Sequence, residues 1–253
     1  MGLATPLPSK LPWRGFLVDS LLTGVLLVGL STLLIVPIVI LEMMANSPGG
    51  KMPAGGPDLS TVMPEITAAA IVAMLLTAVL VWWLRGRSLA GPMSRMAPLT
   101  AYGLAAFAGV IIQVVSQAFS WLLTESGAGP DPSNVEPVTA LIQTAPWIAW
   151  LLIVVVGPFS EELLMRHVLL RRFAVAGHAV AGVVLTSVAF ALMHEPMPTS
   201  AGVAAWLGGL AMYTAMGVGF ALVYLRTGRF RAAFLAHAAC NATALVLTAY
   251  SAS

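Results

Sequence analysis

The chain contains a series of long apolar stretches, and these constrain its fold more than any other feature. A helix that crosses a bilayer needs about 20 mostly apolar residues. Because the bilayer interior offers no water to the backbone, helices are the simplest structures that satisfy every N–H and C=O group there. We therefore predict an all-α fold, a polytopic transmembrane helix bundle of about seven to eight spans. The apolar stretches cover approximately residues 16–44, 65–84, 99–124, 147–173, 178–195, 203–225 and 232–250.

One further apolar segment is too short to classify by its length. It covers about residues 137–145 and ends at Pro146, after which a long helix could run from Trp147 to Phe173. The segment could be a separate short or re-entrant helix, or it could belong to an additional span. The number of spans in the region 137–157 therefore stays open.

The composition agrees with a membrane protein and excludes several other classes. Hydrophobic residues make up 59% of the chain and charged residues only 9%, whereas soluble domains carry about 25% charged residues. The net charge of +2 gives no basis for nucleic acid binding, because the basic residues lie in short loops. The single cysteine, Cys240, excludes an intramolecular disulfide.

Lysine and arginine occur in alternate loops, which predicts the orientation of the helices. Basic residues near the ends of spans favour the cytoplasmic side of a membrane. The loops between the basic groups are poor in Lys and Arg, and Lys51 is their exception. Short loops and an Ala/Gly/Val-rich composition indicate a bacterial inner membrane. The basic groups are Lys10 and Arg14, Arg85 to Arg95, Arg171 and Arg172, and Arg226 to Arg231.

Two adjacent glutamates and an arginine lie inside the apolar stretch 147–173. Charged residues within a membrane segment are costly and usually functional. On a helix, Glu162 and Arg166 are i,i+4 neighbours with the acid first, which favours an ion pair. Glu161 points about 100° away around the helix and cannot share this geometry equally well. We therefore expect Glu162 to be neutralised by Arg166 and Glu161 to be free for chemistry.

Three more polar residues lie inside other apolar stretches. His194 lies deep in the stretch 178–195, while His237 and Asn241 are i,i+4 neighbours and share one helix face. At about 1.5 Å per residue, Glu161, His237 and Asn241 lie about 16, 9 and 15 Å from the basic ends of their helices, and His194 lies about 24 Å deep. These positions predict one pocket that opens on the cytoplasmic side, with His194 near its floor.

The chemistry of these side chains is complementary. A carboxylate in an apolar pocket can act as a general base near neutral pH, and a histidine can give a proton to a leaving amine. His237 and Asn241 can present two N–H donors to an oxyanion. Together the groups predict a peptide hydrolase that activates water with Glu161 and forms no covalent intermediate.

Other interpretations of the same residues stay open. Glu161, His194 and His237 could hold a catalytic zinc ion with one open position, although no His-Glu-x-x-His sequence is present. Buried histidine and asparagine residues also join helices by hydrogen bonds without any catalytic role. A non-catalytic membrane scaffold and a proton-coupled carrier are the corresponding alternatives. We favour the hydrolase without metal or other cofactor, because the four groups suffice for the reaction.

The three groups resemble the motifs of the CPBP intramembrane proteases, which include CAAX prenyl endopeptidases and bacteriocin-processing enzymes. The motifs stand here as Glu161-Glu162-Leu-Leu-Met-Arg166, Phe190-Ala-Leu-Met-His194 and His237-Ala-Ala-Cys-Asn241. They occur in the order of the family, one on each helix, within about residues 146–245. The resemblance divides the chain into N-terminal transmembrane helices (1–136) and a protease core (137–253).

The resemblance implies a function and a role for each motif residue. It implies an endopeptidase that cleaves a membrane-associated peptide or protein, possibly of CAAX type, with the lipid bilayer as its other partner. Glu161 would activate water, His194 would act beside it, and His237 and Asn241 would line the oxyanion site. Glu162 and Arg166 would hold the helix in position. Some family members are thought to act as scaffolds or in immunity to bacteriocins, which keeps the non-catalytic alternative open.

Overall fold

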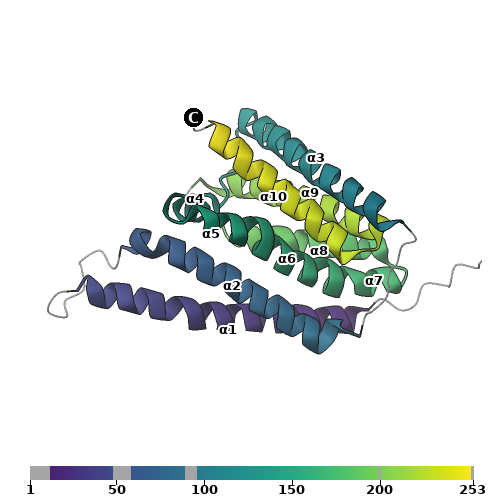
Figure 1. Ribbon diagram of the computed structural model, residues 1–253, viewed down its shortest axis with the longest axis horizontal. Coiled ribbons are helices and arrows are strands. Elements are labelled where there is room, and N and C mark those ends of the chain that lie inside the picture. The colour runs from purple at the N-terminus through teal and green to yellow at the C-terminus, as the bar shows by residue number, and fades with distance from the viewer. Residues whose placement is uncertain (1–11, 48–57, 89–95, 199–200, 252–253) are drawn as a thin grey trace, which may run out of the picture.

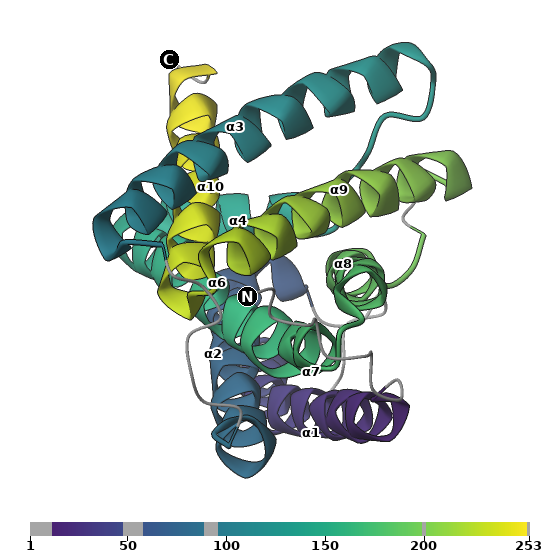
Figure 2. The same cartoon turned by 90° about the vertical axis from the view of Figure 1, so that its right-hand side faces the viewer.

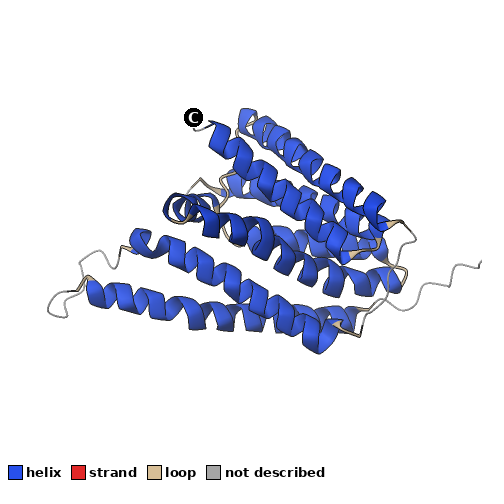
Figure 3. Cartoon of the chain, in the orientation of Figure 1, coloured by secondary structure: helices blue, strands red, loops and turns tan. Residues whose placement is uncertain are grey.

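The computed structural model describes residues 12–47, 58–88, 96–198 and 201–251, and all regular structure within these ranges is helical (Figure 3). The helices follow the apolar stretches closely, which confirms the predicted all-α bundle. The elements are α1 (Trp13–Ala45), η2 (Leu59–Val62), α2 (Met63–Val81), η3 (Trp82–Gly86), α3 (Pro98–Glu125), α4 (Val135–Thr144), α5 (Pro146–Trp150), η4 (Leu151–Val156), α6 (Gly157–Glu162), η5 (Leu163–Leu170), α7 (Arg171–Val175), α8 (Ala179–His194), α9 (Val203–Thr227) and α10 (Phe230–Ser251).

The lengths of the helices decide how many spans the region 137–157 contributes. Six helices in the described ranges are long and apolar enough to cross a membrane, and α8 is a shorter apolar helix of 16 residues. The segments α5, η4, α6, η5 and α7 form one continuous helix over Pro146–Val175. The segment predicted at 137–145 is α4, a separate helix of 10 residues, or about 15 Å, which is too short to cross a bilayer. It therefore adds no span.

The bundle is built from helix pairs on either side of the long central helix. Helix α1 packs on α2, α8 packs on α9, and α10 packs on α3. Figures 1 and 2 show the α1–α2 pair along one side of the bundle and α3 with α10 on the other, with the Pro146–Val175 helix between them. The central helix contacts α2, α8 and α10, so residues near its middle are enclosed on several sides.

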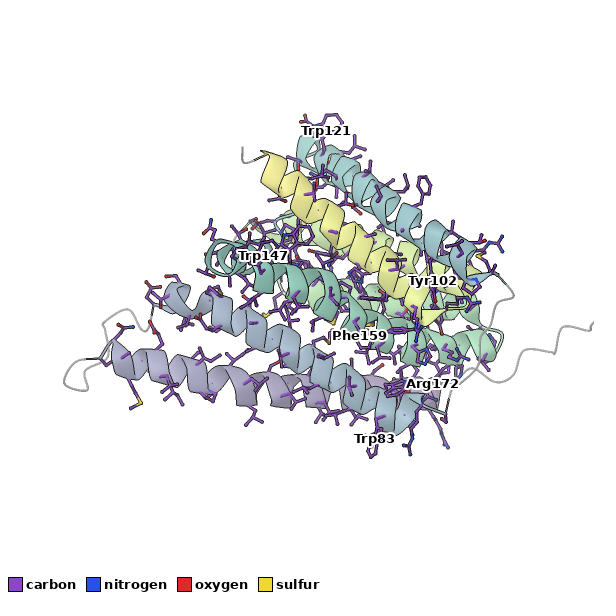
Figure 4. All side chains as sticks on the ribbon, in the orientation of Figure 1. Trp83, Tyr102, Trp121, Trp147, Phe159 and Arg172 are labelled. Atoms are coloured by element: carbon purple, nitrogen blue, oxygen red, sulfur yellow. The ribbon has the colours of Figure 1, made fainter. Side chains whose placement is uncertain are left out.

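Apart from Arg166, the described arginines gather at one end of the bundle, as the alternation of the loops predicts. Figure 4 shows Trp83 and Arg172 at this end and Trp121 and Trp147 at the opposite end. We call these the arginine-rich end and the arginine-poor end. Lys10, Lys51 and Arg95 lie outside the described residues.

A buried carboxylate ties three helices together at the arginine-rich end. Asp19 on α1 is fully buried and forms ion pairs with Arg85 of η3, at 2.7 Å, and with Arg172 of α7. Arg172 also donates to the carbonyl oxygen of Arg85 at 3.0 Å. Beside this cluster, Phe173 packs edge-to-face on Phe16 with ring centroids 5.3 Å apart. Paired charge and aromatic packing together fill this end of the bundle.

Candidate active site

The local shape of the central helix places the candidate residues. Two π-helical stretches, η4 and η5, flank Glu161 and Glu162, and such wide turns often occur at functional sites. Gly157 N–H donates to Leu152 O, five residues back, instead of to Ile153 O. The next residue, Pro158, has no N–H to offer. The carbonyl of Ile153 is thereby released from the helical hydrogen-bond pattern.

The released carbonyl connects the central helix with α10. Asn241 donates from Nδ2 to Ile153 O at 2.9 Å. A carbonyl without a partner inside a membrane protein would cost free energy, so this hydrogen bond stabilises the contact between the two helices. The amide of Asn241 carries a second N–H and a carbonyl oxygen, and the residue lines both cavities at the site. Asn241 can therefore join helices and face a ligand at once.

The predicted ion pair between Glu162 and Arg166 is confirmed. Arg166 Nε lies 3.3 Å from Glu162 Oε2, and both side chains are fully buried. Arg166 Nη2 also donates to the carbonyl oxygen of Gly217 on α9 at 3.0 Å. A buried pair of this kind loses much stability when one partner is removed, since the other charge stays behind. The pair thus fixes the central helix against α9.

Glu161 faces a different environment, also as predicted. Its Oε2 atom lies 3.8 Å from His194 Nε2 and 3.9 Å from His237 Nε2. Oε2 is buried and has no hydrogen-bond partner among the described residues. Glu161, His194 and His237 come from three separate helices, and the structure brings all three together. A gap of nearly 4 Å between polar atoms can accommodate a bridging water molecule.

The other nitrogen of each histidine is held by a defined acceptor. His194 Nδ1 lies 2.9 Å from Phe190 O, and His237 Nδ1 lies 3.1 Å from Glu162 Oε1. A carbonyl oxygen only accepts hydrogen bonds, and so does a carboxylate, so Nδ1 carries the proton in both rings. Both histidines therefore present Nε2 to Glu161. The contact with His237 also gives Glu162 a role that its sequence position did not reveal.

Aromatic rings form the frame around these groups. Phe220 stacks on His237 at 4.3 Å between ring centroids, and Tyr213 stacks on His194 at 4.4 Å. The guanidinium group of Arg166 stacks over the ring of Phe190, with the guanidinium carbon 5.2 Å from the ring centroid. Phe190 was predicted only as part of a motif, and Phe220 and Tyr213 were missed, because aromatic residues are common in any apolar helix.

A loop before α4 closes over the site and was also missed. Glu195, which is 1% exposed, accepts from the backbone N–H of Ser133 at 3.1 Å, and Ser133 Oγ donates to His194 O at 2.9 Å. Tyr213 donates its hydroxyl to Asn134 Oδ1 at 3.1 Å. These bonds hold the loop against the end of α8. Burial raises the pKa of Glu195 above its usual value.

Two cavities meet at the candidate site. One, of about 400 Å³, lies between α3, α4, α9 and α10, and the other, of about 490 Å³, lies between α1, α2, α4 and the central helix. Glu161 lines the second cavity and His237 the first. Both cavities are lined by His194, Asn241, Ile153, Asn134 and Val138.

The cavities extend toward the arginine-poor end, which departs from the sequence-based prediction. Their lining includes Ser120 and Thr248 in the first cavity and Met63 and Pro196 in the second, all of which lie in the half away from the arginine cluster. The sequence predicts a pocket that opens on the cytoplasmic side, whereas these two cavities extend away from the basic end. The reason is that the Asp19 cluster and the adjacent aromatic rings fill the arginine-rich end, which the depth of single residues could not show.

The three possible metal ligands lie somewhat farther apart than the ligands of a bound zinc ion. With bonds of about 2.1 Å, two ligands of a tetrahedral zinc ion lie about 3.4 Å apart. The distances from Glu161 to His194 and His237 are 3.8 and 3.9 Å. Within the described ranges, no group of three or more His, Cys, Asp or Glu side chains is placed to hold a metal ion.

The fold and the site together define a class: a helical membrane protein with a glutamate and two histidines enclosed between its helices. Residues 143–243 match the family described as type II CAAX prenyl endopeptidase Rce1-like. This segment contains all three motifs, and its match supports a likeness to the CPBP intramembrane proteases.

The chain is also similar to a bacterial membrane protein. The chain is 28% identical over 147 residues to the "Putative membrane peptidase YdiL" of Bacillus subtilis (strain 168), a match that covers 56% of this chain and 54% of the relative. The chain thus matches about half the length of this relative. No solved structure matches the chain.

Proposed function

We propose that this protein is an intramembrane endopeptidase in which Glu161 activates water to hydrolyse a peptide bond of a membrane-associated substrate. One observation carries the proposal. The buried Oε2 atom of Glu161 has no hydrogen-bond partner among the described residues and faces Nε2 of His194 and of His237 at 3.8 and 3.9 Å. The family match of residues 143–243 supports a membrane endopeptidase in general.

The first step uses Glu161 as the general base. A water molecule between the three side chains donates a hydrogen bond to Glu161 Oε2 and is oriented by His194 Nε2. Its oxygen adds to the carbonyl carbon of the substrate while one proton passes to Glu161. The electron pair of the carbonyl double bond moves to the carbonyl oxygen, which becomes an oxyanion.

His237 and Asn241 are the groups that would stabilise this oxyanion. Asn241 offers its second amide N–H, since the first is bonded to Ile153 O. His237 donates from Nε2 when it is protonated, and Glu162, at 3.1 Å from its Nδ1, balances that charge. Donors fixed in this way act strongly in a site of low dielectric constant.

The second step breaks the bond between carbon and nitrogen. The oxyanion re-forms the carbonyl group and the amine leaves with the electron pair of the C–N bond. His194 Nε2, 3.8 Å from Glu161 Oε2, can receive the proton held by Glu161 and pass it to the amine. The products are a carboxylic acid and an amine, and all side chains return to their starting states.

The test compares purified wild-type protein with the Glu161→Gln variant in lipid nanodiscs. Fluorogenic CAAX-type peptides and a panel of single-span membrane peptides serve as substrates. We expect Glu161→Gln to lower the rate at least a hundredfold, since positioned bases contribute about 10²–10⁴-fold. Glu125→Gln, at an exposed carboxylate at the end of α3, is the matched control and should cleave normally.

The same assay separates the alternatives. Equal cleavage by wild type and Glu161→Gln would end the proposed mechanism. Loss of activity on chelation and recovery with zinc would show a metal-dependent reaction through Glu161, His194 and His237. Absence of cleavage across the panel, with a cellular phenotype that survives Glu161→Gln, would indicate a scaffold or immunity protein.

The location in a bacterial inner membrane is part of this proposal. The positive-inside rule puts the arginine-rich end in the cytoplasm, and both cavities then reach from the site toward the other side. The two expectations from the sequence, a cytoplasmic basic end and a cytoplasmic pocket, cannot both hold for this arrangement. A reporter enzyme fused after Ser253, tested for activity on each side of the membrane, decides between them.

A further inference from the structure

The cavity between α3, α4, α9 and α10 has a polar wall that the proposed mechanism does not use. Gln113, Ser116, Gln117 and Ser120 of α3 all line it. Their spacing of i, i+3, i+4 and i+7 puts them on one face of the helix. Lipid chains cannot satisfy amide and hydroxyl groups, so such a stripe on a membrane helix marks a face turned toward protein or water. We call this cavity the α3 chamber.

The other face of α3 has the opposite character. Val114 and Val115, which directly precede Ser116 and Gln117, are 51% and 59% exposed. Apolar residues of this kind on the outside of a membrane bundle face lipid. The polar stripe is therefore specific to the chamber side and is not a general property of the helix.

The α3 chamber has a polar wall along α3 and a mixed polar and apolar lining elsewhere, and it carries no full charge other than that of a protonated histidine. No Lys, Arg, Asp or Glu is among the described residues that line it. A charged group that entered would lose its hydration without gaining an ion pair, which is costly. The amide side chains of Gln113 and Gln117 each offer donors and an acceptor, which suits the main chain of an extended peptide. Gln113 Oε1 also accepts from Cys240 Sγ at 3.5 Å, which leaves the N–H groups of Gln113 for a ligand. The uncharged polar groups opposite α3 are Asn134, Thr139, Tyr213 and Thr248.

The second cavity complements the first. It contains Glu161 and is lined largely by apolar side chains from α1, α2 and the central helix, including Leu27, Ile71 and Met74. The two cavities meet at His194 and Asn241. A peptide whose cleaved bond lies beside Glu161 would thus extend along the polar α3 wall on one side and into the more apolar second cavity on the other.

We propose that the α3 chamber binds the polar, uncharged side of the substrate, with Gln113 and Gln117 as residues that determine specificity. The apolar part of the substrate lies in the second cavity. This inference rests on the proposed peptidase function and gives it a substrate class: an extended peptide segment without charged side chains and without a free terminal carboxylate next to the cleaved bond.

The first experiment tests the chamber without any cleavage. Single cysteines replace Gln117 or, as the matched control, Val115, in a Cys240→Ala background. A hydrophilic thiol reagent is added to the protein in nanodiscs. We expect labelling of Gln117→Cys at least tenfold faster than of Val115→Cys, since only the former faces water. Equal slow labelling would show that the chamber is dry and would overturn the proposal.

Protection by a peptide then tests the occupant. The probe is an acetylated and amidated decapeptide of alternating Leu and Ser, and its partner carries Lys at two Ser positions. We expect the uncharged peptide at millimolar concentration to slow labelling of Gln117→Cys at least threefold, and the Lys peptide to have no effect. Unchanged labelling with both peptides, or equal protection by both, would overturn the proposal.

Kinetics distinguish a failure of this inference from a failure of the peptidase proposal. For a substrate whose cleavage depends on Glu161, we expect Gln113→Leu and Gln117→Leu each to raise KM about three- to tenfold, the usual effect of losing one hydrogen bond. The kcat value should stay within twofold, and Val114→Leu should change neither constant. Unaltered KM with intact Glu161-dependent cleavage would overturn the chamber assignment alone, whereas cleavage independent of Glu161 would overturn the mechanism alone.

Discussion

The arginine-rich end and the candidate active site both contain a buried carboxylate, but only the first of these carboxylates is paired with arginines. Asp19 is 0% exposed and forms ion pairs with Arg85 and Arg172. Glu161 has a side chain that is 15% exposed, and among the described residues its Oε2 atom faces two histidines, at 3.8 and 3.9 Å. A buried charge is tolerated when it is paired. Burial alone therefore does not identify a functional carboxylate. A carboxylate that lies beside a cavity and lacks an arginine or lysine partner is a better candidate.

Glu162 lies between these two cases. It is fully buried and paired with Arg166, as Asp19 is paired with its arginines, yet it also holds His237 at 3.1 Å. The two neighbouring glutamates thus have different roles. Glu162 stabilises the helix and orients His237, whereas Glu161 faces the cavities. The comparison of Asp19, Glu162 and Glu161 can be tested by separating activity from stability.

The largest expected effect is on activity at Glu161. Substituting Glu161→Gln should lower kcat about 10²–10⁴-fold, because it removes the base. The thermal unfolding temperature should stay the same or rise, because Glu161 Oε2 has no hydrogen-bond partner among the described residues. Activity and unfolding in nanodiscs, measured on the same preparation, check both values. A marked fall in stability would place Glu161 with Asp19 as a structural residue.

The Glu162–Arg166 pair should show the largest effect on stability. Glu162→Ala leaves the Arg166 charge buried without its partner, which costs about 3–5 kcal/mol in comparable buried pairs. It also removes the acceptor for His237 Nδ1, so activity should fall as well. Denaturant unfolding in detergent gives the free energy change. Wild-type stability in Glu162→Ala would contradict the structural role of the pair.

Substituting Asp19 should lower the stability of the protein without changing its catalytic rate. Asp19→Asn keeps the shape but weakens the hydrogen bonds to Arg85 and Arg172, which we expect to cost about 1–3 kcal/mol. The rate per folded molecule should not change, because the cluster does not line either cavity. Active-site titration of the folded fraction checks this separation, and a large loss of kcat would refute it.

The contact between α3 and α10 depends on a glycine. A Cβ atom at Gly109 would lie 2.1 Å from Ala236 O, whereas nothing lies within 4 Å of one at Gly103. Gly109→Ala should therefore destabilise the protein by about 1–3 kcal/mol through overpacking. Gly103→Ala is the control on the same helix and should be neutral or stabilise by up to about 1 kcal/mol. Equal unfolding temperatures for the two variants would contradict the packing.

The smallest effect concerns Tyr213. Tyr213→Phe keeps the ring on His194 but removes the hydroxyl that donates to Asn134. Losing one hydrogen bond of about 0.5–1.5 kcal/mol should lower kcat about two- to tenfold through the position of His194. The unfolding temperature should change little, and unchanged kcat would show that the loop before α4 does not position the histidine.

Much of the fold and several parts of the site could be predicted from the sequence. Long apolar stretches identified the helices, because a bilayer requires a minimum apolar length for each span. The i,i+4 spacing of Glu162 and Arg166 identified their ion pair, because helix geometry alone places the two side chains together. Polar residues inside apolar stretches indicated the rest of the site, and the structure brings Glu161, His194 and His237 together.

Other features could not be predicted, because they depend on contacts between distant segments. The bond from Asn241 to Ile153 O required knowledge of the wide turn before Pro158. The contacts of Tyr213 and Glu195 with the loop before α4 join residues that lie more than 60 positions apart. The polar residues of α3 recur every three to four positions in the sequence. Only the cavity shows that this polar face points into the bundle.

By itself, the sequence determined a helical membrane protein, its boundaries along the chain and the pairing of charges within one helix, since these follow from local spacing and from the apolar length of each segment. The tertiary structure decided which carboxylate stays without a cationic partner, which end of the bundle is filled and where the cavities lie. The physical reason is that the helix pattern sets the direction of a side chain only relative to its own axis. Its partners are set by the packing of other helices against it.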